Sequence, residues 1–96
     1  MKKIELFVNG KLNRDLVSKK VFEIVSKEKV KTDAELAMKL KEWIKEAGMW
    51  LNFVRCESVK TRDGWKYRVT IGKHSVDLPD VIAHDIKINR NGLGPL

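Results

Sequence analysis

Cysteine is almost absent from this 96-residue chain, and no long apolar run occurs in it. Cys56 is the only cysteine, so no disulfide can form within the chain. That composition fits a reducing compartment, and we expect a cytoplasmic protein. No apolar stretch approaches the length of a membrane span, and the short apolar stretch near the N-terminus predicts a strand, not a signal peptide. We therefore expect no membrane partner.

The sequence also has little of what catalytic and metal sites require. Its two histidines, His74 and His84, belong to no Cys or His pattern typical of zinc. There is no glycine-rich phosphate loop and no Ser-His-Asp pattern. Pro79-Asp80 followed by Asp85-Ile86-Lys87 imitates a motif of metal-dependent nucleases, but its spacing is too short for the usual strand-turn-strand arrangement. We predict no catalytic residue, no metal and no cofactor.

Positive charge is what the chain has in excess. Its net charge is +7, and residues 55–73 alone carry +4. A localised excess can attract nucleic acid or an acidic protein, although charge also serves solubility. Glutamine is absent while lysine, glutamate and valine are abundant, a bias typical of proteins from hot environments.

The pattern of apolar residues predicts one α+β domain over residues 1–90, with residues 91–96 as a flexible C-terminal tail. Alternation over 4–8 indicates a strand ending at the Asn9-Gly10 turn. Asn13 can cap a helix from Arg14 to about Lys29. A capping box at 32–35 opens a second helix that ends at Gly48. Its core stripe comprises Leu36, Leu40, Trp43, Ile44 and Ala47, with Met38 outside it.

Three strands, near 50–60, 65–71 and 74–78, should form an antiparallel meander. Gly72-Lys73 suits a two-residue type II′ turn, which places Val69 opposite Val76 and Arg68 opposite Asp77. For the first hairpin, a four-residue loop at 61–64 pairs Cys56 with Val69. A tight Asp-Gly turn would slide that pairing by two residues, and a bulged turn is rejected because it would reverse one strand's faces.

Beyond Pro79 we expect one helical turn at 80–84 and a last short strand in which Ile86 and Ile88 alternate with polar residues. The predicted fold is therefore an N-terminal strand, two helices, a three-stranded antiparallel meander and a short terminal element. The helices should pack on one face of the sheet.

The basic hairpin is the candidate site. Trp65 and Tyr67 share the core side of the sheet near the loop, where each ring either completes the core or offers a platform for a base. Arg68 is set aside because Glu57 and Asp77 flank it in the predicted register. The remaining cations have no obvious acidic partner and could follow a phosphate backbone. The predicted nucleic-acid-binding residues are Arg55, Lys60, Arg62, Trp65, Lys66 and Lys73.

The leading hypothesis is non-enzymatic binding of DNA or RNA through this hairpin, with little sequence specificity. One alternative is an interaction module for an acidic protein, such as a phage, virus or plasmid accessory protein. A winged helix-turn-helix is another, although only one break between helices is visible where two are needed. The order of elements also resembles that of small ribonuclease toxins that cut messenger RNA, which implies a ribonuclease as a further alternative. That resemblance rests on element order alone, with no shared motif and no transferable catalytic residue.

Overall fold

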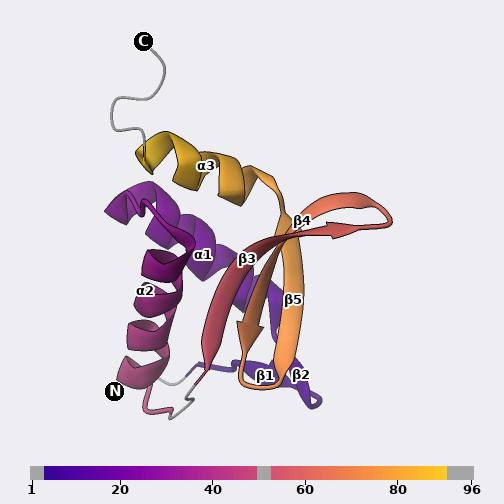
Figure 1. The fold of residues 1–96 in the computed structure, drawn as a ribbon. Helices are drawn as coiled ribbons and strands as arrows, with labels where there is room; N and C mark the ends of the chain where they lie inside the picture. The colour runs from indigo at the N-terminus through magenta and orange to yellow at the C-terminus, as the bar shows by residue number, and fades with distance from the viewer. Residues whose placement is uncertain (1–3, 50–52, 91–96) are drawn as a thin grey trace.

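The computed structural model describes residues 4–49 and 53–90 and shows an α+β fold (Figure 1). A two-stranded hairpin precedes two helices, a three-stranded antiparallel sheet follows, and a third helix comes last. The elements in order are β1 (Phe7–Val8), β2 (Lys11–Leu12), α1 (Arg14–Glu28), α2 (Asp33–Glu46), β3 (Val54–Thr61), β4 (Gly64–Ile71), β5 (His74–Pro79) and α3 (Val81–Arg90).

The predicted N-terminal strand is shorter than its apolar pattern and has its own partner. β1 pairs only with β2, through a turn in which Asn9 and Gly10 both have positive φ (52° and 76°). Such a turn matches the twist of a tight hairpin. The backbone N–H of Asn13 then donates to the Leu6 carbonyl at 2.7 Å, which ties the buried Leu6 to the start of α1.

Both long helices begin at the predicted caps. The Asn13 side chain accepts a hydrogen bond from the Leu16 N–H, and Thr32 Oγ1 accepts one from the Glu35 N–H. Glu35 returns the contact by accepting from the Lys31 N–H at 3.1 Å. α2 ends at Glu46, Ala47 is its C-cap, and Gly48 follows with φ of +84°. The N–H of Met49 donates to the Ile44 carbonyl. This is the glycine-terminated stop that the sequence predicts.

The meander has the predicted register. Val69 pairs with both Cys56 and Val76, and Arg68 lies opposite Asp77. Gly72 has φ of +65° and Lys73 does not have positive φ, as a type II′ turn requires. In the first hairpin Cys56 lies opposite Val69, which confirms this predicted register and excludes the slid alternative. Thr61 also pairs with Gly64, so the loop comprises two residues, Arg62 and Asp63, and not the predicted four.

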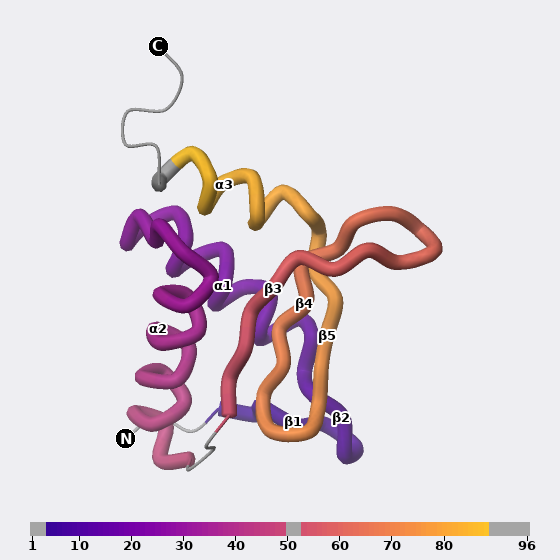
Figure 2. Tube along the Cα trace, viewed as in Figure 1, coloured from indigo at the N-terminus to yellow at the C-terminus, as the bar shows by residue number. Residues whose placement is uncertain are grey.

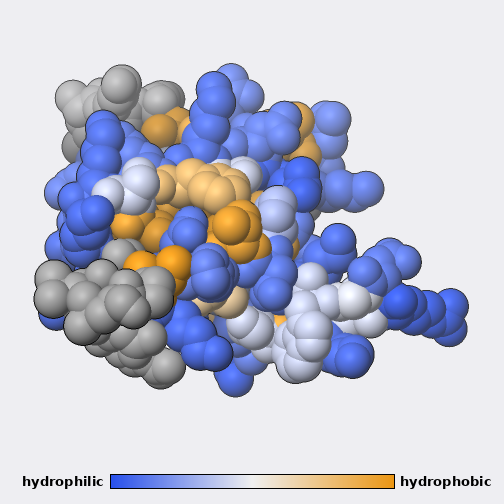
Figure 3. Space-filling view, turned by 90° about the horizontal axis from the view of Figure 1, so that it is seen from above, coloured by the Kyte–Doolittle hydropathy of each residue, from blue (hydrophilic) through white to orange (hydrophobic). Residues whose placement is uncertain are grey.

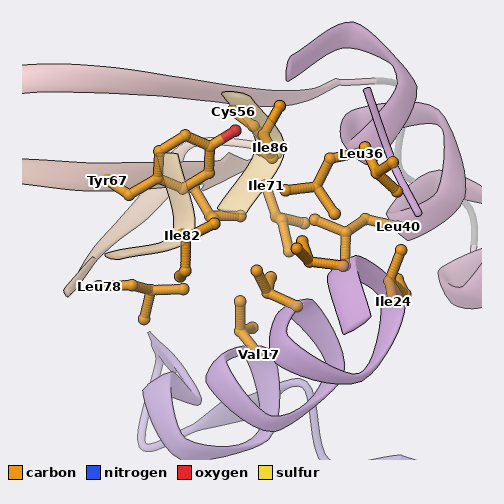
Figure 4. Close-up of a cluster of buried hydrophobic side chains, with 14 of the residues drawn as sticks. Val17, Ile24, Leu36, Leu40, Cys56, Tyr67, Ile71, Leu78, Ile82 and Ile86 are labelled. Atoms are coloured by element: carbon orange, nitrogen blue, oxygen red, sulfur yellow. The ribbon is translucent and has the colours of Figure 1, made fainter. Parts of the chain in front are cut away.

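One face of the sheet builds the core. Figure 4 shows Tyr67, Ile71 and Leu78 directed toward side chains of the helices. Leu40 of α2 is fully buried there, whereas Met38 is 62% exposed, so the predicted phase of this helix is confirmed. The other face carries polar side chains such as Arg68, and therefore the helices cover a single face.

The expectation for residues 80–90 was wrong in part. A helix, α3, replaces the single turn and final strand. Ile82 and Ile86 are both buried, and their spacing of four residues places them on one helical face against the core. Ile86 and Ile88 alternate with polar residues, a pattern that fits a strand equally well in isolation. Packing against the core therefore decides between a strand and a helix. Figure 1 shows α3 lying across one end of the molecule.

Parts of two predictions lie outside the described residues: the start of the predicted strand at 50–52 and the predicted tail at 91–96. Within the described ranges, no helix is both long enough and apolar enough to cross a membrane.

Candidate nucleic-acid interface

The end of the β3–β4 hairpin projects beyond the body of the protein (Figures 1 and 2). In the space-filling view it extends as an arm of hydrophilic and near-neutral residues (Figure 3). Antiparallel pairing continues through Lys60–Trp65 to Thr61–Gly64, so the arm is a regular two-stranded ribbon. A narrow ribbon of this kind can reach a partner from both of its faces.

Trp65 is the most unusual residue of the arm because this large aromatic residue is 53% exposed. It lies on the same face as Tyr67, which is fully buried, but it extends past the core. Lys60 is directly opposite in the register, and its Nζ lies 5.7 Å from the centre of a Trp65 ring. This distance permits a cation–π contact. The arrangement places a large π-surface and an ammonium group together in solvent.

The turn at the tip is held by Thr61. Its Oγ1 donates to the Gly64 carbonyl at 2.7 Å and accepts from the Asp63 N–H at 3.2 Å. Gly64 has φ of +104°, a conformation that other residues rarely adopt, which explains glycine at this position. Arg62 is exposed beside it, and its side chain forms no hydrogen bond or ion pair with the described residues. Lys66 belongs to the opposite face of the ribbon, paired with Val59.

Two predicted site residues do not join this group. Lys73 lies in the β4–β5 turn at the other end of the sheet (Figure 1). Trp65 and Lys73 are eight residues apart along β4 and its turn, or about 26 Å at the usual strand rise. Arg55 pairs with Thr70, and its guanidinium forms an ion pair of 3.1 Å with Glu57. The expectation that Arg55 lacks an acidic partner was therefore wrong, because residues two apart in a strand share one face.

Arg68 has the acidic partner on β5 that the predicted register gives it. Its guanidinium donates two hydrogen bonds to the Asp77 carboxylate, at 2.7 and 3.2 Å. The hydrogen bond from Arg68 lowers the pKa of Asp77 below its ordinary value. The sequence predicts that Glu57 and Asp77 both flank Arg68. Only Asp77 forms an ion pair with it, however, since Glu57 pairs with Arg55 and not with Arg68.

The buried titratable groups do not form a reactive site. Burial raises the pKa of the Cys56 thiol to about 12, so the thiol stays protonated and weakly nucleophilic. Burial, reinforced by the hydrogen bond to Asp33, also raises the pKa of Tyr67. Among the described residues no three His, Cys, Asp or Glu side chains are grouped to hold a metal ion. Asp80 immediately precedes α3 and Asp85 lies within it, so both lack the strand setting of the nuclease motif.

The residues of the arm were predicted from the sequence, but the contact between Lys60 and Trp65 was not. The predicted register already contained that pair, because a loop at 61–64 makes these two residues the first pair beyond it. The register therefore carried a signal for the contact. It did not reveal how far the hairpin extends past the helices, which depends on tertiary packing.

No model of a known protein family matches the chain, and no curated protein and no solved structure matches it either.

Proposed function

We propose that the protein binds nucleic acid through the projecting end of the β3–β4 hairpin, with little dependence on sequence. The observation that carries the proposal is the half-exposed Trp65 with Lys60 over its ring. Burying a large aromatic ring is favourable, so a ring left in solvent among cations is suited to stacking on a base. Lys60 and Arg62 supply positive charge for phosphates on either side of that ring.

The geometry favours a smaller set of contact residues than the six that the sequence predicts. Lys60, Arg62 and Trp65 form the contacting group, and Lys66 adds attraction from the opposite face. Arg55 and Lys73 are too far along the sheet to contact the same few nucleotides. Single strands are favoured over duplex because their bases are free to stack on an aromatic ring.

Fluorescence anisotropy with a labelled oligothymidine and a labelled duplex, at about 50 mM and about 200 mM salt, tests the proposal. Lys60→Gln should weaken binding to the single strand and flatten the salt dependence by about 0.7, the value for one phosphate contact. Lys66→Gln removes the same charge from the opposite face and should have the smaller effect. Equal effects of the two substitutions would show that only net charge matters.

A second control separates the arm from the rest of the surface. Replacing Lys60, Arg62 and Lys66 together by Ala should greatly weaken binding. Replacing Lys11, Lys19 and Lys29, which are exposed elsewhere, removes as much charge and should weaken it much less. Intact RNA after prolonged incubation is expected, and specific cleavage products would favour the ribonuclease instead.

A further inference from the structure

The two edges of the three-stranded sheet differ in how they are protected. The strand order β3-β4-β5 makes β3 and β5 the edge strands. β5 is short and ends at Pro79, and the Arg14 side chain donates to its Asp77 carbonyl at 3.0 Å. A proline and a side chain that occupies an edge carbonyl both hinder the addition of another strand. β5 is therefore a blocked edge.

α2 packs against β3, but this strand contains no proline, and no side chain of the described residues bonds to its outward carbonyls. The Gly72 N–H donates to the Phe53 carbonyl at 2.8 Å, which makes 53 and 72 a hydrogen-bonded pair in the register of the hairpin. Because such pairs alternate, Arg55 and Glu57 bond to β4 while the backbone groups of Val54, Cys56 and Ser58 point away from it. These outward N–H and C=O groups have no hydrogen-bond partner among the described residues.

The free backbone opens into a crevice between β3 and α2. Two adjoining hollows share Asp33 and Ala34, and together they follow the strand from Val54 to Ser58. The small side chains of Ala34 and Ala37 leave room on the α2 side. Apolar surface at the two ends of the crevice comes from Met38, which is 62% exposed, and from Ala83 and Ile86 of α3.

Charge around the crevice has one dominant sign. The cationic residues that line it are Lys31, Lys41, Arg55 and Lys87, and among the described residues Asp33 is the only acidic one that lines it. The Asp33 carboxylate already accepts a hydrogen bond of 2.7 Å from the Tyr67 hydroxyl. Lys31, Lys41 and Lys87 form no ion pair with described residues. This surface complements an acidic chain, and it opposes a second copy of a protein with net charge +7.

We propose that an extended acidic segment of a partner protein adds to the edge of β3 in this crevice as a fourth strand. Its backbone pairs with Val54, Cys56 and Ser58, its apolar side chains contact Ala37 and Met38, and its carboxylates face the surrounding lysines. Main-chain hydrogen bonds supply affinity in this mode of recognition, and alternate side chains supply selectivity. The proposal is independent of the arm and of nucleic-acid binding.

The probe is an acetylated and amidated heptapeptide in which glutamate and valine alternate, titrated into the ¹⁵N-labelled protein. The N–H signals of Val54, Cys56 and Ser58 should shift and become protected from hydrogen exchange. Those of Arg55 and Glu57, which already bond to β4, should change far less. This alternation is the signature of strand addition, and a purely electrostatic contact does not produce it.

Two controls separate backbone pairing from charge. Two variants of the peptide carry N-methyl groups on alternate residues, one variant for each alternate set. Both keep the charge of the peptide. The variant methylated on the residues whose N–H groups pair with β3 loses those donors and should bind at least tenfold more weakly. Ser58→Pro removes one free edge N–H without breaking a bond to β4, and it should weaken binding tenfold or more, whereas Ser58→Ala should not. Lys41→Gln should weaken binding several-fold, and Lys19→Gln, on α1, should leave it unchanged.

Several results would overturn the proposal. They are peptide binding that tolerates N-methylation, shifts confined to Lys60–Trp65, and the absence of shifts in β3 at millimolar peptide. Edge N–H signals that become protected with rising protein concentration alone would assign the crevice to a second copy. A single-stranded oligonucleotide that shifts the same three signals would assign it to nucleic acid. If Ser58→Pro fails to fold, the N-methylated peptide still decides.

Discussion

The Tyr67 hydroxyl donates a hydrogen bond of 2.7 Å to Oδ1 of Asp33, joining the centre of the sheet to the first turn of α2. Tyr67 is fully buried, and Asp33 lies just after the Thr32 cap. The carboxylate is also well placed at a helix N-terminus, where negative charge is stabilising. The bond thus ties the first turn of α2 to β4, and Asp33 also lines the crevice beside β3.

Removing that hydroxyl should destabilise the protein moderately. Tyr67→Phe keeps the buried ring and loses a hydrogen bond to a charged group. The free energy of unfolding should therefore fall by no more than roughly 1.5–3 kcal/mol, the usual contribution of such a bond. Urea unfolding should show this loss. Asp33→Asn leaves an acceptor in place and should cost less than Tyr67→Phe. An unchanged unfolding free energy for Tyr67→Phe would show that water replaces the bond without cost.

Leu40 and Met38 provide a matched test of the core. Leu40 is fully buried and Met38 is 62% exposed on the same helix. Leu40→Ala should lower the free energy of unfolding by roughly 2–5 kcal/mol, the range for a large-to-small change in a core. Met38→Ala should lower it by about 0.5 kcal/mol or less. Chemical denaturation that ranks the two in reverse would contradict the packing of α2.

Cys56 should make the protein less stable at high pH. Burial raises the pKa of its thiol from an ordinary 9.0 to about 12, so the folded state holds the proton more tightly than the unfolded state. This contribution is fully present below pH 9 and is lost as pH rises toward 12, with a slope of at most about 1.4 kcal/mol per pH unit.

Cys56→Ala is the control for that pH dependence, because other groups also titrate at high pH. The difference in unfolding free energy between wild type and Cys56→Ala should decrease between pH 9 and about 10.5 in urea titrations. A difference that stays constant over this range would mean that the folded thiol titrates normally.

Most of the fold follows from local signals in the sequence. The Asn13 and Thr32 caps, the Gly48 stop and the Gly72-Lys73 turn each depend on residues within a few positions of one another. The strand register follows as well, since a slip would move Val69 out of the core. α3 could not be predicted in this way, because Ile86 fits both a strand and a helix until the surface that buries it is known.

The sequence was enough to locate the basic hairpin, but not to tell which of its cations lie close together. Charge counting identified the basic hairpin, yet it grouped Arg55 and Lys73 with residues at the other end of the sheet. A strand separates its ends by about 3.3 Å per residue, so nearness in sequence is not nearness in space. The crevice beside β3 was also out of reach, since it depends on how closely α2 approaches the strand.

The most direct test of the central claim measures Trp65 itself. The chain has three tryptophans, so the double substitution Trp43→Phe and Trp50→Phe leaves Trp65 as the only one. Its retained folding is checked by thermal unfolding. Adding single-stranded oligothymidine at about 50 mM salt should quench the Trp65 emission as bases stack on the ring. Trp65→Ala, in the otherwise wild-type protein, should weaken this binding by about 1–3 kcal/mol and weaken duplex binding less. Binding detected by anisotropy without a change in emission, or no binding at all, would contradict the account.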